Sequence, residues 1–395
     1  MSSEFPLEII FEILIRLSVK PLLRFRCVSK SWCAIIDSPL FINGHVKRSI
    51  ETNTNHQLIL EEWDFGTRGC PSNLYSASID EGLGISLKGM GKPLMHQSGG
   101  LFSNSCNGLI LMYDAYEVVA IWNPFTRRCR KIPTEPFETP NRELCPDWPS
   151  TFGFGYDNIH DDYKAVRIMG FHPKDSLRAH EVKVYSLRTN TWKRVQDFPY
   201  LGYIFRQDYG AFASGASHWL LFRIRPTDNF DYMDTNLIAA FDYVKEEFQV
   251  LPQPEYTEVF GHNCLVALQG CLCMLSINQS MDATQVTMYM MKNYGMRGSW
   301  NKSHIFTQAN IPSGFLCARP LVYSMRGDKM LIEVGCTEGW EECRMGLVWY
   351  NLQEKKGSKV EICNKHPRFT ALVCLESLVS LGEDDHFDGA HEICQ

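Results

Sequence analysis

The sequence of 395 residues lacks any apolar run near the length of about 20 residues that a bilayer-spanning helix requires. It also lacks an excess of positive charge, since 39 lysines and arginines stand against 45 aspartates and glutamates, for a net charge of -6. A general nucleic-acid-binding protein is expected to carry a basic face. The basic cluster at residues 127–131 is short and typical of a solvated hairpin, so this class of protein is not favoured.

A secretory signal is not indicated either, because the first apolar stretch is interrupted by Glu8, Glu12 and Arg16. The 15 cysteines are odd in number and scattered along the chain, without the spacing of a disulfide framework. Such cysteines are typical of proteins whose thiols stay reduced. We therefore expect the protein in the cytoplasm, the nucleus or both, with no insertion into a membrane.

Motifs of the common catalytic sites are missing as well. The sequence has no GxSxG nucleophile elbow and no glycine-rich phosphate loop. Cys271 and Cys273 are too close together for a CxxC redox or zinc pair and are typical of buried structural thiols. The neighbouring carboxylates at 161–162 and 246–247 point apart on a strand or turn, which suits solvated positions better than acid–base catalysis. We expect no catalytic residue, no metal and no cofactor.

Residues 5–36 are the most informative part of the chain, because they carry more apolar surface than they can bury. Between positions 5 and 17, nine of the 13 residues are large and apolar, and Glu8, Glu12 and Arg16 leave only a thin polar line on a helix. A unit of roughly 40 residues covers a low fraction of its own surface. The excess of apolar surface predicts a partner.

Local signals in this stretch predict three short helices. Pro6 suits the first position of a helix that ends before Pro21, because the residue preceding a proline is driven out of helical space. Pro21 opens a second helix that extends to about Cys27. Ser29 is a suitable N-cap for a third helix, which stops at residues 37–39.

The order of residues in this stretch resembles the F-box, the module that docks a protein onto the Skp adaptor of a cullin–RING ubiquitin ligase. Four segments carry the resemblance: 5–10, 13–14, 17–20 and 24–32. Two departures are minor, since Phe5 stands where leucine is usual and Ser18 where proline is common. The alternative is an N-terminal helical cap that packs on its own C-terminal domain.

The resemblance implies binding to a Skp-type adaptor and, through it, to a cullin and a RING subunit. Nine residues are expected to matter most, some for docking and others for the core of the module itself, and the sequence does not divide the two sets. They are Pro6, Leu7, Ile10, Leu14, Leu17, Leu22, Leu23, Val28 and Trp32.

From residue 57 onward the pattern is that of an all-β domain, with short apolar strands between Gly, Pro, Asn and Asp. In each repeat a glycine launches a strand, and an aromatic residue recurs on a later strand at positions 122, 185, 241, 289 and 349. Steps of 48 to 63 residues between these aromatics suit four-stranded propeller blades. An opening blade at 57–80 gives about six blades, and pairing of the last strand, 371–375, with this blade would remove the open sheet edges. A β-sandwich is the rival fold.

The expected organisation is α+β and multidomain. A three-helix F-box covers residues 1–42, and an all-β, kelch-like β-propeller covers residues 57–382. Residues 43–56 are expected to form a linker, whose polar part, 47–56, is a plain linker or a short helical lead-in, and residues 383–395 are expected to form an acidic C-terminal tail.

Several segments of the β domain resemble the F-box-associated domain of plant F-box proteins, a kelch-like region. The clearest of them are 105–109, 122–126, 153–157 and 184–192. Members of this family include self-incompatibility F-box proteins of pollen and proteins that control immune-receptor levels. The segments 288–300 and 319–323 look closer to the immune-regulating branch.

The two resemblances imply the substrate-recognition subunit of an SCF-type ubiquitin ligase, which binds a target protein, promotes its ubiquitination and degradation, and performs no chemistry itself. Target binding is expected from aromatic residues in two loops that break the repeat, because exposed aromatics are enriched at binding hot spots. They are Tyr200, Tyr203, Phe205, Tyr209, Phe230 and Tyr232. Two alternatives stay open: a Skp-binding scaffold that leads to no degradation, and a propeller enzyme whose N-terminal helices cap the ring.

Overall fold

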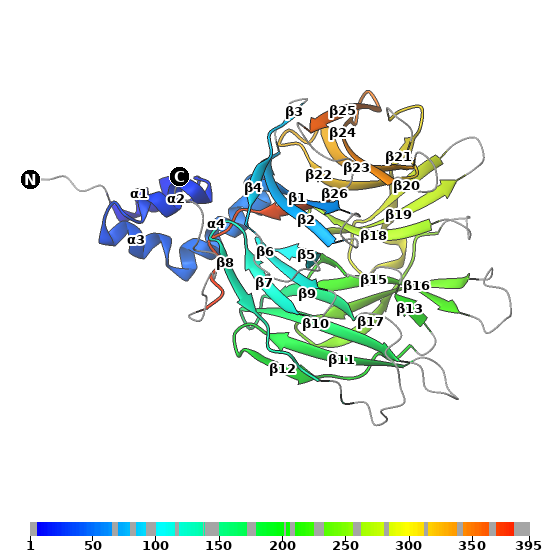
Figure 1. Cartoon of the computed structure of the whole chain (residues 1–395), viewed down its shortest axis with the longest axis horizontal. Helices are drawn as coiled ribbons and strands as arrows, with labels where there is room; N and C mark the ends of the chain where they lie inside the picture. Colours follow the sequence, from blue (N-terminus) through cyan, green and yellow to red (C-terminus); the bar gives the residue numbers. More distant parts are fainter. Residues whose placement is uncertain are drawn as a thin grey trace, which may run out of the picture.

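The computed structural model describes residues 6–64, 70–79, 84–91, 100–114, 118–136, 138, 150–171, 179–200, 203–205, 210–224, 233–255, 262–279, 284–311, 315–337, 343–362 and 369–382. Within these residues, four helices precede a ring of β-sheets and lie to one side of it (Figure 1). Among the described helices, none has both the length and the apolar composition to cross a membrane.

The strands of the described residues form six sheets, which are the blades of a β-propeller. Blade 1 contains β26 (Phe369–Leu375), β1 (His56–Asp64), β2 (Cys70–Ser78) and β4 (Lys88–Met90). Blade 2 contains β5 (Gly100–Cys106), β6 (Leu109–Asp114), β7 (Val119–Asn123) and β8 (Arg128–Lys131). Blade 3 contains β9 (Thr151–Asp157), β10 (Asp162–Phe171), β11 (Ala179–Ser186) and β12 (Thr191–Arg194). Blade 4 contains β13 (Tyr203–Phe205), β14 (Ala211–Ala213), β15 (Ala216–Ile224), β16 (Met233–Asp242) and β17 (Glu247–Leu251).

Blade 5 contains β18 (His262–Leu268), β19 (Cys271–Gln279), β20 (Thr284–Met291) and β21 (Trp300–Thr307), with the 3-10 helix η2 (Arg297–Ser299) before its last strand. Blade 6 contains β22 (Cys317–Tyr323), β23 (Lys329–Thr337), β24 (Cys343–Asn351), β25 (Lys356–Ile362), and the short β3 (Gly84–Ile85). β3 pairs in parallel with β25, so a segment of the first blade covers the outer edge of the last.

The recurring glycines and aromatics of the sequence lie in the turns and in the third strands of the blades. Gly108, Gly215 and Gly270 each close a two-residue hairpin turn in which both residues have positive φ, a conformation that favours glycine. The five repeating aromatics all lie in the third strand of a blade: Trp122 in β7, Tyr185 in β11, Phe241 in β16, Tyr289 in β20 and Trp349 in β24. The prediction of about six kelch-like blades is confirmed.

The ring closes through the last strand, as the sequence predicted. β26 pairs with β1 over the register from Phe369 with Glu62 to Leu375 with His56. The last blade also holds the inner side of β26, because Arg319 donates to the Ala371 carbonyl (2.5 Å) and Glu333 accepts from the Ala371 N–H (2.8 Å). A closed ring of this kind leaves no open first or last sheet, and the rival β-sandwich was wrong.

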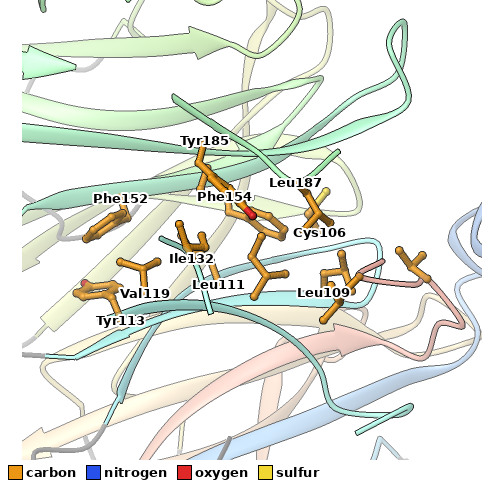
Figure 2. Close-up of a cluster of buried hydrophobic side chains, with 14 of the residues drawn as sticks. Cys106, Leu109, Leu111, Tyr113, Val119, Ile132, Phe152, Phe154, Tyr185 and Leu187 are labelled. Carbon is orange, nitrogen blue, oxygen red and sulfur yellow. The ribbon is translucent and has the colours of Figure 1, made fainter. Parts of the chain in front are cut away.

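Neighbouring blades are held together by apolar clusters and by a repeated polar contact. Figure 2 shows one such cluster, between the sheets of blades 2 and 3, in which Leu111 and Ile132 of one sheet meet Phe154 of the other. At two seams a tryptophan on the outermost strand donates its indole N–H to a proline carbonyl that follows the outermost strand of the preceding blade. These pairs are Trp192 with Pro133 and Trp300 with Pro252, each at 2.7 Å.

The glycines of the segment 153–157 admit large side chains from the next blade. A Cβ at Gly155 would overlap the rings of Tyr243 and Phe212, and one at Gly153 would overlap Trp219. We expect Gly155→Ala to destabilise the ring by about 1–3 kcal/mol, because a well-packed interior absorbs extra volume only by strain. The denaturant midpoint of the chain measures this loss.

Gly89 provides the matched control, since a Cβ there would meet no atom within 4 Å. Gly89→Ala should change the free energy of unfolding, measured in the same way, by less than about 0.5 kcal/mol. Equal effects of the two substitutions would contradict the packing argument.

The first three helices are α1 (Leu7–Leu14), α2 (Val19–Phe25) and α3 (Lys30–Ile36). The Ser29 hydroxyl accepts from the Trp32 N–H (3.2 Å), which confirms the predicted N-cap. The predicted start of the second helix at Pro21 was wrong by two residues. Pro21 lies in the first turn of α2, where a missing N–H costs no intrahelical hydrogen bond.

A fourth helix, α4 (Pro39–Glu51), follows directly and joins the helices to the ring. Ser38 caps it by accepting from the Phe41 N–H (3.2 Å), and Pro39 occupies its first turn, so the signal that stops α3 also starts α4. Of the two alternatives for residues 47–56, the helical lead-in is what the structure has as far as Glu51. Residues 383–395, expected as an acidic tail, lie outside the described residues.

The helices sit on one face of the ring, which we call the helix-side face. In antiparallel blades, the first-to-second and third-to-fourth turns leave from the same face. Both kinds of turn meet the helices here, since the Asn53 amide donates to the Tyr323 and Ser324 carbonyls (3.2 Å each) and Phe125 packs against the helical core. The strand ends between second and third strands therefore lie at the opposite, distal face (Figure 1).

Candidate interaction surfaces

Helix α1 buries one side and leaves a second apolar side uncovered. Leu14 is fully buried in the core of the helices, together with Leu22 and Phe41. Ile9 and Ile13, one turn apart on the helix, remain 47% and 57% exposed although the ring is in place. The surface defined by Ile9 and Ile13 is called the α1 apolar face below; Leu7 is 52% exposed but lies two residues from Ile9, on another side of the helix.

A shallow groove of about 560 Å³ follows the α1 apolar face. It is lined by Ile9 and Ile13 and continues to Leu17, with Glu12 and Arg16 at its border. These two charged side chains form an exposed pair at 3.6 Å, which adds little stability but marks a polar rim. An apolar centre with a charged rim is the usual anatomy of a protein-binding surface.

The structure divides the nine residues that the sequence could not divide. Leu14 and Leu22 are buried and serve the module's own core. Ile10, Leu17, Leu23 and Trp32 are half-buried, and Trp32 packs edge-on against Phe25 with ring centroids 5.6 Å apart. The exposed members are Pro6, Leu7 and Val28.

Two exposed residues of the α1 apolar face, Ile9 and Ile13, were missing from the predicted set. A signal for them was present, because Ile9 and Ile13 share the i, i+4 spacing of Glu8 and Glu12. Apolar residues that track a polar line on a helix belong to its outer side, and both isoleucines are exposed there.

Three of the predicted target-binding aromatics lie in the described part of the chain, and all three pack against the apolar cluster between blades 3 and 4. Phe205 is half-buried and packs between blades 3 and 4, with its ring centroid 5.2 Å from Phe198 and 5.9 Å from Trp219. Tyr200 and Tyr203 are half-buried and meet edge-on at 6.4 Å, so they lie together at the border of this cluster. Tyr209, Phe230 and Tyr232 lie outside the described residues.

Polar residues that could suggest catalysis are engaged in structural contacts. His218 is fully buried and bonds through Nδ1 to the Ala211 carbonyl (2.9 Å) and through Nε2 to the Tyr294 hydroxyl (2.8 Å). Burial lowers the pKa of His218 to about 4, which keeps it neutral. Burial likewise raises the pKa of the Cys273 thiol to about 12, so it stays protonated. Among the described residues, no group of three His, Cys, Asp or Glu side chains is placed to hold a metal ion.

A buried ion-pair network ties blade 3 to blade 4 on the helix-side face. The Lys164 ammonium lies 2.9 Å from the carboxylates of both Asp157 and Glu246 and donates to the Tyr243 carbonyl at the same distance. Lys193 approaches Glu246 from the outside at 3.0 Å. The carboxylate at position 246 therefore serves the contact between blades.

Comparison with known proteins agrees with this architecture. The chain matches the model of the F-box domain over residues 2–43 and that of the F-box associated beta propeller domain over residues 72–381. It is 32% identical over 396 residues to the F-box protein CPR1 of Arabidopsis thaliana, covering 95% of this chain and 88% of that protein. It is 27% identical over 359 residues to the F-box/kelch-repeat protein At3g23880 of the same plant, covering 88% and 87%.

A solved oligogalacturonate lyase from Vibrio parahaemolyticus aligns with 76% of this chain and 78% of its own, at 11% identity and a TM-score of 0.39. This likeness carries no information about activity. The two family matches, by contrast, follow the order of helices and ring in the structure, and together they span most of the chain. The chain belongs to the plant F-box proteins that carry an F-box-associated β-propeller domain.

Proposed function

We propose that the chain is the substrate-recognition subunit of an SCF-type ubiquitin ligase. The F-box binds a Skp-type adaptor through the α1 apolar face, and the propeller holds a target protein. One observation carries the first half of this proposal: Ile9 and Ile13 stay exposed although the ring already covers the helical core from the other direction. Apolar surface left open on a folded module is typical of a binding site.

The contribution to ubiquitin transfer is proximity. A cullin and a RING subunit, reached through Skp, bring the charged ubiquitin carrier to the complex, and the propeller holds the target beside it. Holding two reactants on one frame raises their effective concentration without any chemistry by the frame itself. The engaged state of His218 and of the carboxylate of Glu246 supports an adaptor rather than an enzyme.

The distal face is the surface that we propose for target binding, because the F-box already occupies the helix-side face. Tyr203 begins β13 and Tyr200 precedes it, at the end of blade 4 where β15 finishes. They are the members of the predicted aromatic set that retain partial exposure in the described residues, together with the more deeply packed Phe205. We propose the cytoplasm, the nucleus or both as the location, where thiols such as those of Cys106 and Cys374 stay reduced.

Reconstitution with purified Skp, cullin, RING subunit and ubiquitin carrier tests the proposal. We expect stable co-purification with Skp and ubiquitin transfer to the receptor itself or to a bound target. Proteins that accumulate on a variant lacking Skp binding would then be identified by mass spectrometry. If their half-life in cells is the same with the intact chain and with this variant, the protein is a scaffold and not a degradative receptor.

A further inference from the structure

The segment that follows the last strand, residues 376–381, does not leave the ring but runs between the ring and the F-box. Blade 2 provides the hydrogen-bond donors that hold this segment on the ring. The Asn123 amide donates to the Ser377 and Val379 carbonyls (3.1 and 2.9 Å), and the Arg130 guanidinium donates to the Leu381 carbonyl (2.7 Å).

Two motifs that marked the propeller in the sequence receive this segment. Asn123 is fully buried and uses its other amide atom, Oδ1, to shape the turn by accepting from the Phe125 N–H (3.0 Å). Gly108 lies against Ser377 and the Leu375 carbonyl so closely that a Cβ would overlap both. Gly108 therefore makes room for the segment and Asn123 binds it, in addition to the part that each has in a turn.

The same segment reaches into the F-box at two places. Leu378 is buried in the helical core beside Leu14, Leu22 and Phe41. The Glu376 carboxylate accepts from the Val19 N–H (3.0 Å) at the start of α2, where the N-cap Ser18 makes no side-chain bond of its own. A carboxylate at this position satisfies one of the free N–H groups of a helix start.

Glu376 also fixes the chain that leads from α4 into the first blade. Its second carboxylate oxygen accepts from the Gln57 amide (2.8 Å), and its backbone N–H donates to the Asn55 carbonyl (2.7 Å). One residue thus contacts α2 of the F-box, the connection after α4 and the first strand of the ring.

We infer that residues 376–381 are an interdomain clasp that sets the orientation of the F-box on the propeller. α4 and the residues that follow it attach the F-box to the ring through Val46 and Asn53, and Phe125 adds an apolar contact, but an apolar contact and one helix still allow the F-box to pivot. The clasp adds a second attachment at α2, and two separate attachments remove that freedom. The functional consequence rests on the proposed function: in the ligase, the clasp positions the target relative to the ubiquitin carrier.

The test compares Glu376→Ala and the double variant Glu376→Ala/Leu378→Ala with Ser380→Ala, whose exposed side chain lies in the same segment. Loss of the helix-start hydrogen bond should speed amide exchange at Val19 about fivefold or more, with α2 following in the double variant. X-ray scattering of the Skp-bound chain should show a broader distribution of distances in both variants. Glu376→Gln, which keeps an acceptor oxygen, should restore most of the protection.

A functional readout separates positioning from stability. In the reconstituted ligase, the wild-type chain should receive ubiquitin on a restricted set of propeller lysines, and the clasp variants on a wider set at unchanged Skp affinity. Exchange and scattering identical to those of Ser380→Ala would overturn the clasp. Absence of any ubiquitin transfer with the wild-type chain would overturn the proposed function instead, while the exchange and scattering results would still decide the clasp.

Discussion

Replacing Ile13 by aspartate is expected to weaken Skp binding by about 30-fold or more, and the Ile9→Asp/Ile13→Asp double variant by more than about 100-fold. A buried apolar anchor of an interface contributes roughly 2 kcal/mol or more, and each 1.4 kcal/mol corresponds to about a factor of ten in affinity. Both side chains are exposed in the free chain, so a charge there costs little folding stability. Titration calorimetry with purified Skp measures the affinity.

Ile159 is the matched control. It is 70% exposed and lies in the turn between β9 and β10, on the ring rather than on the F-box. Ile159→Asp should leave Skp affinity unchanged within about twofold. Full affinity in Ile13→Asp would show that the α1 apolar face is not the docking surface.

Leu14→Asp provides a contrast within the same helix. Leu14 is fully buried, and an unpaired charge in its place would disrupt the core of the F-box. It should therefore lose Skp binding together with the helical signal of α1–α4, whereas Ile13→Asp loses binding alone. Far-UV circular dichroism of the full-length chain, which reports helix content, distinguishes the two outcomes.

Lys164→Met is expected to destabilise the propeller by about 3–5 kcal/mol. The Lys164 side chain is 8% exposed, and its removal leaves the fully buried Asp157 carboxylate without its cation. Breaking one partner of a buried ion pair strands the other charge, which is the costly event. Chemical denaturation followed by tryptophan fluorescence measures the change.

Lys193→Met is the control, because Lys193 contacts the same Glu246 but is 72% exposed. An exposed pair contributes about 1 kcal/mol or less, so this variant should be nearly neutral. Similar losses in the two variants would show that the network does not depend on the buried cation.

The acid stability of the chain follows from the same network. Burial by itself would raise the pKa of Asp157, but hydrogen bonds from Lys164 and from the His160 and Ile159 amides outweigh it and lower the pKa to about 2. A carboxyl with a lowered folded pKa contributes stability that is present above its ordinary value of 3.8 and is lost as the pH falls toward 2. In Asp157→Asn, the free energy of unfolding should fall less between pH 4 and pH 2 than in the wild-type chain, because this carboxyl no longer takes up a proton there.

Local signals in the sequence were sufficient for the elements whose causes are local. The N-cap at Ser29 and the positive-φ glycine turns depend on neighbouring residues alone. The start of α2 was misplaced because Pro21 tolerates several positions in a first turn. The start of α4 was missed because Ser38 and Pro39 were interpreted only as the end of α3, although the same residues also suit a helix start.

Residues whose role depends on distant parts of the chain could not be assigned from the sequence. The contact of Phe205 with Trp219 is an example, because it forms only when β13 pairs with the far end of β15. Leu14 and Ile13 are adjacent and equally apolar, and only the packing of α1 on the other helices separates core from surface.

The order of motif residues carried the resemblance to the F-box, and turn residues and repeat length predicted the propeller, because all of these are properties of neighbouring positions. Which side of α1 stays open, and the fact that residues 376–381 join the ring to the F-box, follow from packing in the folded chain. Those contacts link residues hundreds of positions apart, as in the hydrogen bond between Val19 and Glu376. Such distances in sequence leave no periodic signal, so the contact arises only when the closed ring brings the last strand back to the first helices.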